Sequence, residues 1–382
     1  MAKVMPGDQV KTLAIPARNT RAMESQWRLM WRRFRKHRVA VAALGVVAAF
    51  YLVVLFADFF AYADPLASEA DRSLLPPQPI RFINDGRLGP HVYALKGVRD
   101  PRTFKRVYVQ DPTQKIPVTL FARGYQYKLL GVIPTDRHLL GVSGASAEQS
   151  LFLLGTDVQG RDLWSRLMLA TRVSLSVGLI GVTLSLALGV VLGGLSGYFV
   201  GPLDAIIQRI IEILRSIPTI PLWMGLAAAL PREWGVIQVY FAITIIISLI
   251  AWTELARVVR GRFLSLRQEE FVVAAQVVGC SQLRIIFRHM VPSFLSHIIA
   301  VTTLALPAMI ISETSLSFLG LGMRPPALSW GVLLQQAQNV QAIAITPWLL
   351  LPAVPVIVAV LAFNFLGDGL RDAADPYAIL TK

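Results

Sequence analysis

Long apolar runs separated by short polar stretches dominate this chain, and they predict helices that cross a membrane. Four runs carry no Asp, Glu, Lys or Arg, and they cover residues 39–57, 173–203, 234–253 and 289–312. A helix needs roughly 20 apolar residues to cross the hydrocarbon core of a bilayer, and each run is about that long or longer. Two further runs cover residues 205–230 and 346–366. We therefore expect an all-α polytopic membrane protein with six transmembrane helices.

The third expected span, 205–230, differs from the others because its first half is charged. Arg209, Glu212 and Arg215 lie three residues apart there, so both arginines can pair with the glutamate on one helical face. Structural pairing of this kind is a better interpretation of the three charges than contact with a solute. A half-charged helix also has an alternative position along the membrane surface.

Basic residues beside the spans predict which side of the membrane each connection occupies. The segment before the first span holds ten Lys and Arg against two acids, and the 257–292 connection holds six Arg against two Glu. Because Lys and Arg concentrate in cytoplasmic loops, both segments are expected inside the cell. Six spans starting inside also place 257–292 inside, so we expect N-in, C-in topology. The net charge of +14 then needs no nucleic-acid partner.

The first 60 residues divide into a cytoplasmic basic segment, 1–38, and a first transmembrane helix, 39–60. A cleavable signal peptide is the alternative, since Ala61-Tyr62-Ala63 resembles a cleavage site, but the apolar run is too long for one. Before Glu24 an unstructured basic tail is as good an interpretation as a helix. Four residues share one helical face and predict an interfacial helix leading into the first span: Trp27, Met30, Trp31 and Phe34.

Residues 61–150 break the membrane pattern, because they are rich in proline and charge. The topology places them outside the cytoplasm as an extended external insert between spans one and two. Short strands are expected within DPRTFKRVYVQDPTQKIPVTLF and YQYKLLGVIP. Either a small cap-like domain or a decorated loop agrees with this length. The sole cysteine, Cys280, lies on the cytoplasmic side, so no intrachain disulfide can join parts of the insert.

Motifs of hydrolytic, metal and nucleotide chemistry are missing from the sequence. It contains no GxxxxGK[ST] phosphate loop and no HExxH, GxSxG or CxxC pattern, and its five histidines show no ligand spacing. Leu195-Ser196-Gly197-Tyr198 superficially resembles an ATPase signature but lies in an apolar span. Because 54% of the residues are hydrophobic and only 16% are charged, the chain belongs with membrane proteins and not with soluble enzymes. We expect no catalytic, metal or cofactor site in this chain.

Four sequence blocks resemble an inner-membrane permease of the dipeptide, oligopeptide and nickel class of ABC importers, of the second (C-type) kind. They lie in the expected order and cover most of residues 151–382, the expected transmembrane domain. The blocks are Leu154-Gly155-Thr156-Asp157 with Gly160-Arg161-Asp162, Ser165-Arg166-Leu167 and Arg172-Val173-Ser174-Leu175; the EAA loop 270–292; Glu313 to Gly322 with Pro325-Pro326 and Ser329-Trp330-Gly331; and Gly367-Asp368-Gly369-Leu370-Arg371-Asp372-Ala373 with Asp375-Pro376.

This resemblance implies a multi-pass protein of the bacterial inner membrane that works in an assembly. Its expected partners are a homologous permease subunit, two ABC ATPase subunits that bind ATP and Mg, an extracytoplasmic substrate-binding protein and membrane lipid. Within the coupling loop 257–292, the residues expected to contact the ATPase are Glu270, Phe271, Ala274, Ala275, Gly279, Leu283, Arg284, Phe287, Arg288 and Pro292. The residues expected to line a pathway or gate are Glu313, Thr314, Ser315, Ser317 and Trp330.

The EAA loop departs from the family pattern at one position. Val273 stands where the Glu of the EAA triplet usually lies, and Glu270 takes the acidic place upstream. Ala274 and Ala275 are small enough for a short helix to seat closely in a groove on a partner. Gly279 lets the chain turn without Cβ strain. The alternative is a surface amphipathic helix with no partner.

The second half of the loop has its own apolar face, formed by Leu283, Ile286 and Phe287. The neighbouring Arg284, Arg288 and His289 are expected to face water or acidic partner groups. Pro292 is expected to open the fifth span. In the first turn of a helix the backbone N–H has no intrahelical partner, so a proline there loses no hydrogen bond.

Two further features of the spans have both a packing and a functional interpretation. Gly189, Gly193, Gly197 and Gly201 lie four residues apart and predict a small-residue stripe for close helix packing, with flexibility near a gate as a second role. Glu313 falls late in the fifth span and opens a Ser/Thr-rich turn, so it either lines the pathway or forms local hydrogen bonds near the external surface.

The expected function is that of a permease subunit that moves short peptides handed over by an external binding protein. Oligosaccharides, opine-like conjugates and nickel complexes are alternative cargoes, because related systems carry them. Two other classes remain: an ion-coupled secondary transporter, for which we see no internal repeat, and a membrane sensor, for which the cytoplasmic segments are short.

Overall fold

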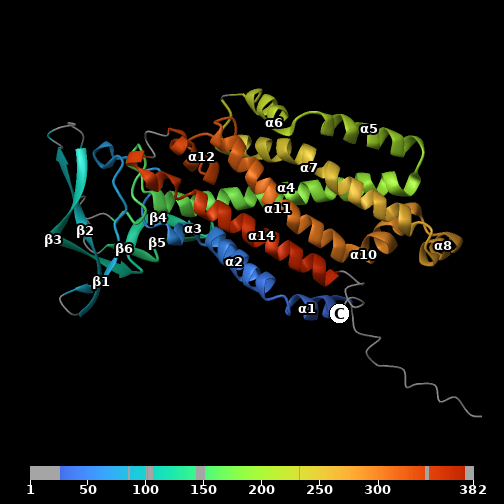
Figure 1. The fold of residues 1–382 in the computed structure, drawn as a ribbon, viewed down its shortest axis with the longest axis horizontal. Coiled ribbons are helices and arrows are strands. Elements are labelled where there is room, and N and C mark those ends of the chain that lie inside the picture. The colour runs from blue at the N-terminus through green and yellow to red at the C-terminus, as the bar shows by residue number, and fades with distance from the viewer. Residues whose placement is uncertain are drawn as a thin grey trace, which may run out of the picture.

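The computed structural model describes residues 26–84, 87–99, 101, 106–142, 151–231, 233–339 and 344–374. Figure 1 shows a bundle of helices running side by side, with β-strands at one end and the short helix α8 (Glu270–Val277) at the other. We call these the sheet end and the α8 end. Five described segments are long and apolar enough to span a membrane: α2 (Arg38–Leu55), α4 (Leu163–Phe199), α7 (Val236–Leu266), α11 (Leu295–Phe318) and Pro347–Ala374.

The long helices overlap the predicted runs but begin and end elsewhere. The helix α4 begins at Leu163, because Asp162 accepts a hydrogen bond from the Ser165 N–H and caps its first turn. The helix α7 continues to Leu266, so the first ten residues of the expected 257–292 connection are helical. The last span combines the 3₁₀ turn Pro347–Leu350 with α14 (Ala353–Ala374).

The third expected span is not one continuous helix. Residues Pro202–Ser216 form α5 and Thr219–Ala228 form α6, and the two axes meet at 87°. The break lies at Ile217 and Pro218, because a proline lacks an N–H and pushes the residue before it into extended backbone. The charges that made this span uncertain occupy α5. The described residues therefore hold five candidate spans, or six if the bent pair α5–α6 counts as one.

The charge pairing predicted in this region is only half correct. Arg209 lies 3.1 Å from the Glu212 carboxylate, as expected. Arg215, in contrast, lies 3.8 Å from Glu254 on α7, so it joins two helices and does not share Glu212. Both pairs are largely exposed within the chain.

Three glycines of the predicted stripe pack α4 closely against α7, two of them against its backbone and one against a side chain. A Cβ on Gly193 would lie 2.5 Å from the Ala256 carbonyl oxygen, and one on Gly197 would lie 2.7 Å from the Arg260 carbonyl oxygen. A Cβ on Gly189 would meet the Leu255 side chain at 2.9 Å. Gly201 does not belong to the stripe, because it lies beyond the end of α4 with a φ of +87° and nothing near it.

The segment expected to be an external insert contains β-structure, so the all-α prediction is wrong there. A four-stranded antiparallel sheet has the order β1-β2-β3-β6, and a separate hairpin pairs β4 with β5. Both stretches expected to contain strands do so. The strands are β1 (Arg81–Asn84), β2 (Arg87–Arg99), β3 (Arg106–Leu120), β4 (Arg123–Leu129), β5 (Ile133–Arg137) and β6 (Leu140–Val142).

The four-stranded sheet buries a small apolar core of its own. Val92 on β2 lies opposite Ile116 on β3, and both side chains are buried. Tyr62, at the start of the insert, and Leu151, just after its end, belong to the same cluster. Alternating strand residues cover this core, which is why the segment forms a sheet and not a loose loop.

A short amphipathic helix, α1 (Gln26–Phe34), precedes α2, and Figure 1 shows it at the α8 end. Phe34 is buried against Ala40 and Gly369, whereas Trp31 is about half exposed. The residues before 26 and after 374, including Asp375-Pro376, lie outside the described residues.

Candidate functional sites

The segment after α7 turns sharply at Gly279 and then returns to the bundle. The Cys280 N–H donates to the Ala275 carbonyl over 3.0 Å, and the Gly279 N–H donates to the Gln276 carbonyl over 2.9 Å. This pair of bonds is the Schellman motif, which needs a left-handed residue after the helix, and Gly279 has a φ of +80°. A Cβ there would meet no atom within 4 Å, so backbone conformation and not space selects glycine.

The return path is a series of short helical turns and not the start of the fifth span. It consists of α9 (Gln282–Arg284), the π-helical turn Ile285–Met290 and α10 (Val291–Ser293). Pro292 lies within α10, and Phe294 interrupts the helix before α11 begins at Leu295. The prediction that Pro292 opens the fifth span is therefore wrong by one short turn.

One face of this segment packs against its own bundle. Val272 on α8 is fully buried with Ile286 and Met290 of the π-helical turn. The same cluster includes Phe263 on α7 and Phe294, whose rings meet edge to face at 5.8 Å. Burial of several large apolar side chains fixes the segment to α7 and to the start of α11.

The opposite face exposes a large amount of apolar surface. Val277 and Val278 are each 81% exposed, and Phe271 and Val273 on the same short helix are exposed too, so the apolar surface is a patch and not a single side chain. Such patches mark sites of interaction with a protein or a membrane. The charged residues expected to face the partner, Glu270, Arg284 and Arg288, are exposed. Ala275 and Ile286 face inward instead, so the predicted faces are corrected at these two positions. The other exposed members of the predicted contact set are Phe271, Ala274, Gly279, Leu283, Phe287 and Pro292, and Val273 beside them is exposed as well.

The α8 end also holds an ion pair that the sequence analysis missed. Arg260 on α7 donates two hydrogen bonds to Asp204 on α5, each 2.7 Å long. Ser196 on α4 also donates to the Asp204 carboxylate. The pair lies where Gly197 meets Arg260, so three helices meet close to the segment that returns from α8. An isolated Asp in an apolar stretch was the available signal.

At the sheet end, a buried polar network joins α4, α11 and α12 (Trp330–Gln335). Glu313 accepts hydrogen bonds from Ser174 over 3.0 Å and from Ser317 over 2.8 Å. The Ser174 oxygen in turn accepts from the Trp330 N–H over 3.0 Å, and the Trp330 indole N–H donates to Thr171 over 3.1 Å. Buried polar groups satisfied in this way hold their elements in a single arrangement.

These contacts place the five expected pathway residues. Glu313, Ser317 and Trp330 are fully buried within the chain, Thr314 is nearly so and Ser315 is half-buried. Side chains enclosed by their own subunit do not line a pathway in this conformation. The geometry therefore favours the alternative that Glu313 forms local hydrogen bonds, and it extends that alternative to Ser317 and Trp330.

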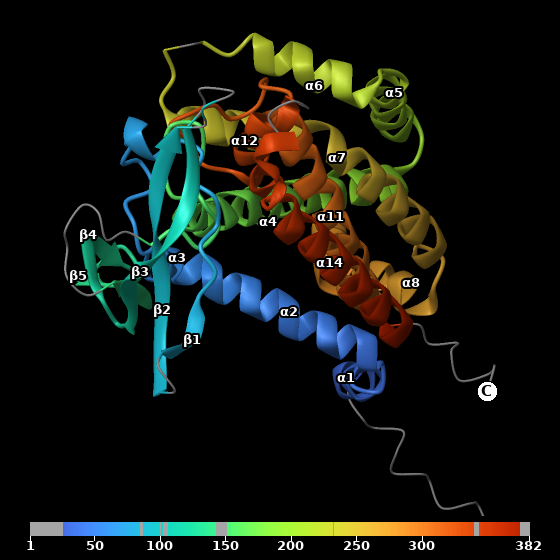
Figure 2. The same ribbon diagram turned by 60° about the vertical axis from the view of Figure 1, so that its left-hand side comes forward.

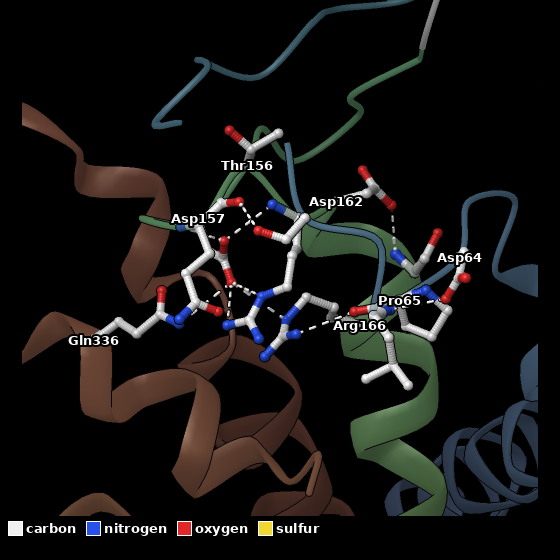
Figure 3. Close-up of polar contacts among 12 residues, drawn as sticks. Asp64, Pro65, Thr156, Asp157, Asp162, Arg166 and Gln336 are labelled. Carbon is white, nitrogen blue, oxygen red and sulfur yellow. Dashed lines mark hydrogen bonds and ion pairs between the residues drawn. The ribbon is translucent and has the colours of Figure 1, made fainter. Parts of the chain in front are cut away.

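The first motif block, 154–167, forms a polar clasp between the sheet segment and the bundle (Figure 3). Asp157 is fully buried and lies 2.7 Å from an Arg161 nitrogen and 3.5 Å from the Arg166 Nε. Gln336 donates a further hydrogen bond to it over 3.3 Å. Burial alone would raise the pKa of Asp157, but the hydrogen bonds from Arg161 and the charge of Arg166 hold it below its usual value.

Asp162, in the same clasp, has the opposite electrostatic setting. Its carboxylate accepts from the Tyr62 hydroxyl over 2.9 Å and caps α4, but no arginine in the described part of the chain hydrogen-bonds to it. Burial raises the pKa of Asp162 to about 6. Tyr62 lies at the start of the insert, 100 residues before Asp162, so no local sequence signal could have revealed this pairing.

The glycines of the clasp allow its backbones to approach closely. Gly160 has a φ of +74°, and a Cβ on it would lie 1.9 Å from the Glu69 carbonyl oxygen. Gly155 has a φ of +77°, and a Cβ on it would clash with the Leu75 carbonyl oxygen. The Trp348 indole N–H donates to the Thr156 carbonyl over 3.0 Å and brings in the start of the last span. The motif therefore joins the insert, α4 and the last span.

A cavity of about 750 Å³ opens among the long helices between the clasp and the α8 end. Apolar side chains from α4, α6, α7 and α11 line most of it, among them Trp223, Ile247 and Met309. Glu254 and His297 add polar groups. A cavity of this size, mostly apolar with a few polar groups, has the character of a binding or passage site for a small solute.

Comparisons with known proteins identify the family. A family described as the binding-protein-dependent transport system inner membrane component matches residues 189–378, and the N-terminal TM domain of oligopeptide transport permease C matches residues 25–77. The oligopeptide transport system permease protein OppC of Haemophilus influenzae is 41% identical over 243 residues, which are 63% of this chain and 75% of that protein. The chain belongs to the family of binding-protein-dependent inner-membrane permeases.

A second relative agrees with this membership. The OppC protein of Escherichia coli (strain K12) is 42% identical to this permease over 236 residues, covering 62% of this chain and 76% of that protein. A solved structure of the MetNI methionine ABC transporter in inward-facing conformations aligns with 54% of this chain and 96% of its own, with 18% identity and a TM-score of 0.45. The permease is thus a multi-pass protein of the bacterial inner membrane.

Proposed function

We propose that this permease moves short peptides across the inner membrane in an importer driven by ATP hydrolysis in partner subunits. The single observation that carries the proposal is the exposed apolar face of α8 and its Gly279 turn, rigidly backed by the α7 and α11 helices. A face of this kind needs a partner, and its rigid backing can transmit motion to the spans. Peptides are the proposed cargo because relatives at about 40% identity are named oligopeptide permeases.

The proposed topology is N-in and C-in with six spans, the bent pair α5–α6 counting as the third. This assignment places the α8 end in the cytoplasm, where the basic residues concentrate, and the sheet end outside. The clasp and the strands then face the side from which a binding protein delivers its cargo. The α8 segment faces the side where ATP is available.

The proposed assembly contains a homologous permease, two ABC ATPase subunits and an external binding protein. ATP and Mg bind to the ATPases and not to this chain. The coupling contacts are the exposed residues around Gly279: Glu270, Phe271, Val273, Ala274, Val277, Val278, Leu283, Arg284, Phe287 and Arg288. Their mixture of apolar and charged groups suits a helix seated in a groove with acidic groups at its edge.

Within this assembly, the cavity lined by Trp223, Ile247 and Met309 is the proposed half of the translocation pathway. Its mostly apolar wall suits cargoes with varied side chains, and Glu254 and His297 supply polar contacts toward the α8 end. The Glu313 network lies beyond the cavity and holds α12 against α4 and α11. We assign α12 the role of an external closure, which opens only when these helices separate.

The test is reconstitution of the whole assembly. The tagged permease is purified in mild detergent with its co-purifying chains, which mass spectrometry identifies. The complex is then placed in liposomes with its binding protein and supplied with ATP, and uptake of a peptide mixture, an oligosaccharide and a nickel chelate is measured. Peptide uptake that requires ATP supports the proposal. ATP-dependent uptake of another cargo alone would retain the machinery and overturn the peptide assignment.

The same preparation separates this function from its competitors. Uptake driven by an imposed proton or sodium gradient without ATP would identify a secondary transporter. Purification of the chain without any ATPase, under conditions that keep comparable assemblies intact, would also contradict the proposed coupling. A binding response without uptake would favour a sensor.

A further inference from the structure

The hairpin formed by β4 and β5 ends in an apolar tip. Its connection is Leu130, Gly131 and Val132, and Ile133 begins the returning strand. Leu130 and Ile133 are each 56% exposed and Val132 is 78% exposed. Hairpin turns are usually made of Gly, Asn, Asp, Ser and Pro, which water solvates easily. Three large apolar side chains at such a tip indicate an apolar medium around it.

This hairpin is fixed to the sheet end of the first span. The His138 ring, just after β5, lies 2.9 Å from the Asp58 carbonyl and 3.0 Å from the Tyr125 carbonyl on β4. The Leu139 N–H donates to the Phe59 carbonyl over 2.8 Å. Asp58 and Phe59 belong to α3 (Ala57–Phe60), which directly follows α2. Figures 1 and 2 both show the hairpin beside α3, so it lies where the first span leaves the membrane.

The apolar surface continues from the span to the hairpin. Leu52 and Leu55 on α2 are 54% and 52% exposed, as expected for side chains that face lipid. The Phe59 ring lies 6.1 Å from the Phe121 ring, and Phe121 and its neighbour Leu120 are exposed. Phe and Leu are typical of the apolar face of elements that lie in the interface between lipid and water. The exposed surface of α2 therefore extends onto the base of the hairpin.

Cations flank this apolar surface. Arg123, Lys128 and Arg137 are all exposed on the two strands. Asp136 is the only acid between residues 120 and 139, and it lies 3.9 Å from Arg123. An apolar tip with basic residues behind it has the composition of elements that insert into a lipid interface, with the cations on the phosphates.

We propose that the β4–β5 hairpin is a membrane-interface anchor, whose tip inserts into the external leaflet while Arg123, Lys128 and Arg137 contact lipid phosphates. The anchor holds the β-segment against the membrane beside the first span. Continuity with the lipid-facing surface of α2 favours lipid over a protein partner. The proposal rests on the membrane topology proposed above and is independent of the cargo.

Fluorescence quenching in nanodiscs tests this anchor with the assembled complex. Cys280→Ser removes the only native thiol, and Val132→Cys then carries a bimane probe. Lipids with a nitroxide near the headgroup should quench most of the emission at this position. Val98→Cys, half exposed on β2, is the matched control and should lose little. Leu52→Cys, near the external end of α2, is the positive control, and its quenching by lipid nitroxides confirms that the span lies in the bilayer.

Three outcomes decide the matter. Quenching at Val132 that weakens several-fold with Lys128→Glu, or when phosphatidylcholine replaces phosphatidylglycerol, supports a basic lipid anchor. Quenching no stronger than at Val98, while Leu52 stays quenched, would overturn the anchor without touching the topology. A blue-shifted probe at Val132 that lipid nitroxides do not quench would place a protein partner there and overturn the lipid assignment.

Discussion

Arg260 on α7 donates two hydrogen bonds of 2.7 Å to Asp204 on α5, and this pair joins the two helices beside the backbone contact of Gly197. The pair is partly buried, since 31% of the Arg260 side chain and 11% of the Asp204 side chain are exposed. The helices it joins include the one that leads directly into the α8 segment. Under the proposed coupling, a motion imposed on α8 would reach α5 through this contact as well as through packing.

The first prediction concerns that pair. Asp204→Asn keeps the shape but removes the charge, so it should cost about 1.5–3 kcal/mol, the usual value of hydrogen bonds to charged groups. Lower thermal stability of the purified complex and slower transport are the expected results. Glu212→Gln is the matched control, because Glu212 pairs with Arg209 on the exposed face of the same helix. Equal effects of the two substitutions would contradict the linking role.

The second prediction tests the clasp of the first motif block. Asp157→Asn leaves Arg161 and Arg166 buried without a carboxylate, a change that costs roughly 3–5 kcal/mol for buried pairs. We expect little folded protein in the membrane, measured by the yield of monodisperse complex. Glu69→Gln breaks a nearby pair with Arg72 in which Glu69 is half exposed, and it should change stability by less than about 1 kcal/mol. Normal yield of Asp157→Asn would argue against the clasp.

The third prediction is a pH dependence. Burial raises the pKa of Asp162 to about 6 from 3.8, so the folded chain binds this proton more tightly than the unfolded chain. Its stabilising contribution is therefore complete below pH about 4 and is lost as pH rises through about 6. Asp162→Asn retains an acceptor for Tyr62 and a helix cap but cannot ionise.

The melting temperature of Asp162→Asn relative to the parent should therefore rise between pH about 4 and about 6, and then stay level. The corresponding rise in the free energy of unfolding of Asp162→Asn relative to the parent is at most about 3 kcal/mol, because each unit of pKa shift is worth about 1.4 kcal/mol. A constant difference between the two proteins over this range would refute a raised pKa.

The membrane spans could be predicted from the sequence, because apolar runs long enough to cross a bilayer rarely occur in other structures. The runs that became α2, α4, α7, α11 and the last span were all visible. The residues at which these helices begin and end could not be predicted, because they depend on local contacts. Asp162 caps α4, and Phe294 interrupts the helix before α11. The sequence analysis expected one continuous span over 205–230 and did not use Pro218, which marks the break. The 87° bend there depends on how α6 packs against α7.

The same distinction applies to the candidate sites: features set by local sequence could be predicted, and contacts between distant elements could not. The turn at Gly279 and the exposed charges around it follow from local chemistry, so sequence patterns found them. Tyr62 with Asp162 and Asp204 with Arg260 are pairs between distant elements, and nothing in one element specifies its partner. Glu313 was ambiguous for the same reason, because the serine that satisfies it lies 139 residues away on α4.

The fourth prediction concerns the packing of α4 on α7. A Cβ on Gly193 would lie 2.5 Å from the Ala256 carbonyl oxygen, and backbone at that distance cannot move aside cheaply. Gly193→Ala should cost about 1–3 kcal/mol through overpacking. Gly45→Ala on α2 is the control, because a Cβ there meets nothing within 4 Å and alanine favours the helix. Thermal melts of both variants in detergent measure the difference, and equal melts would contradict close packing.

The last prediction tests coupling at Gly279. Because its φ is +80° and the space around it is open, Gly279→Val strains only the backbone of the turn. Left-handed backbone costs an ordinary residue roughly 1–2 kcal/mol, so the turn should shift and transport should fall about tenfold. ATP hydrolysis by the assembled complex should persist, because the ATPases keep their own sites. Gly279→Asn is the control, since asparagine tolerates this conformation, and it should retain most of the transport. Equal transport by the two variants, with the complex intact, would show that the turn does not transmit the motion.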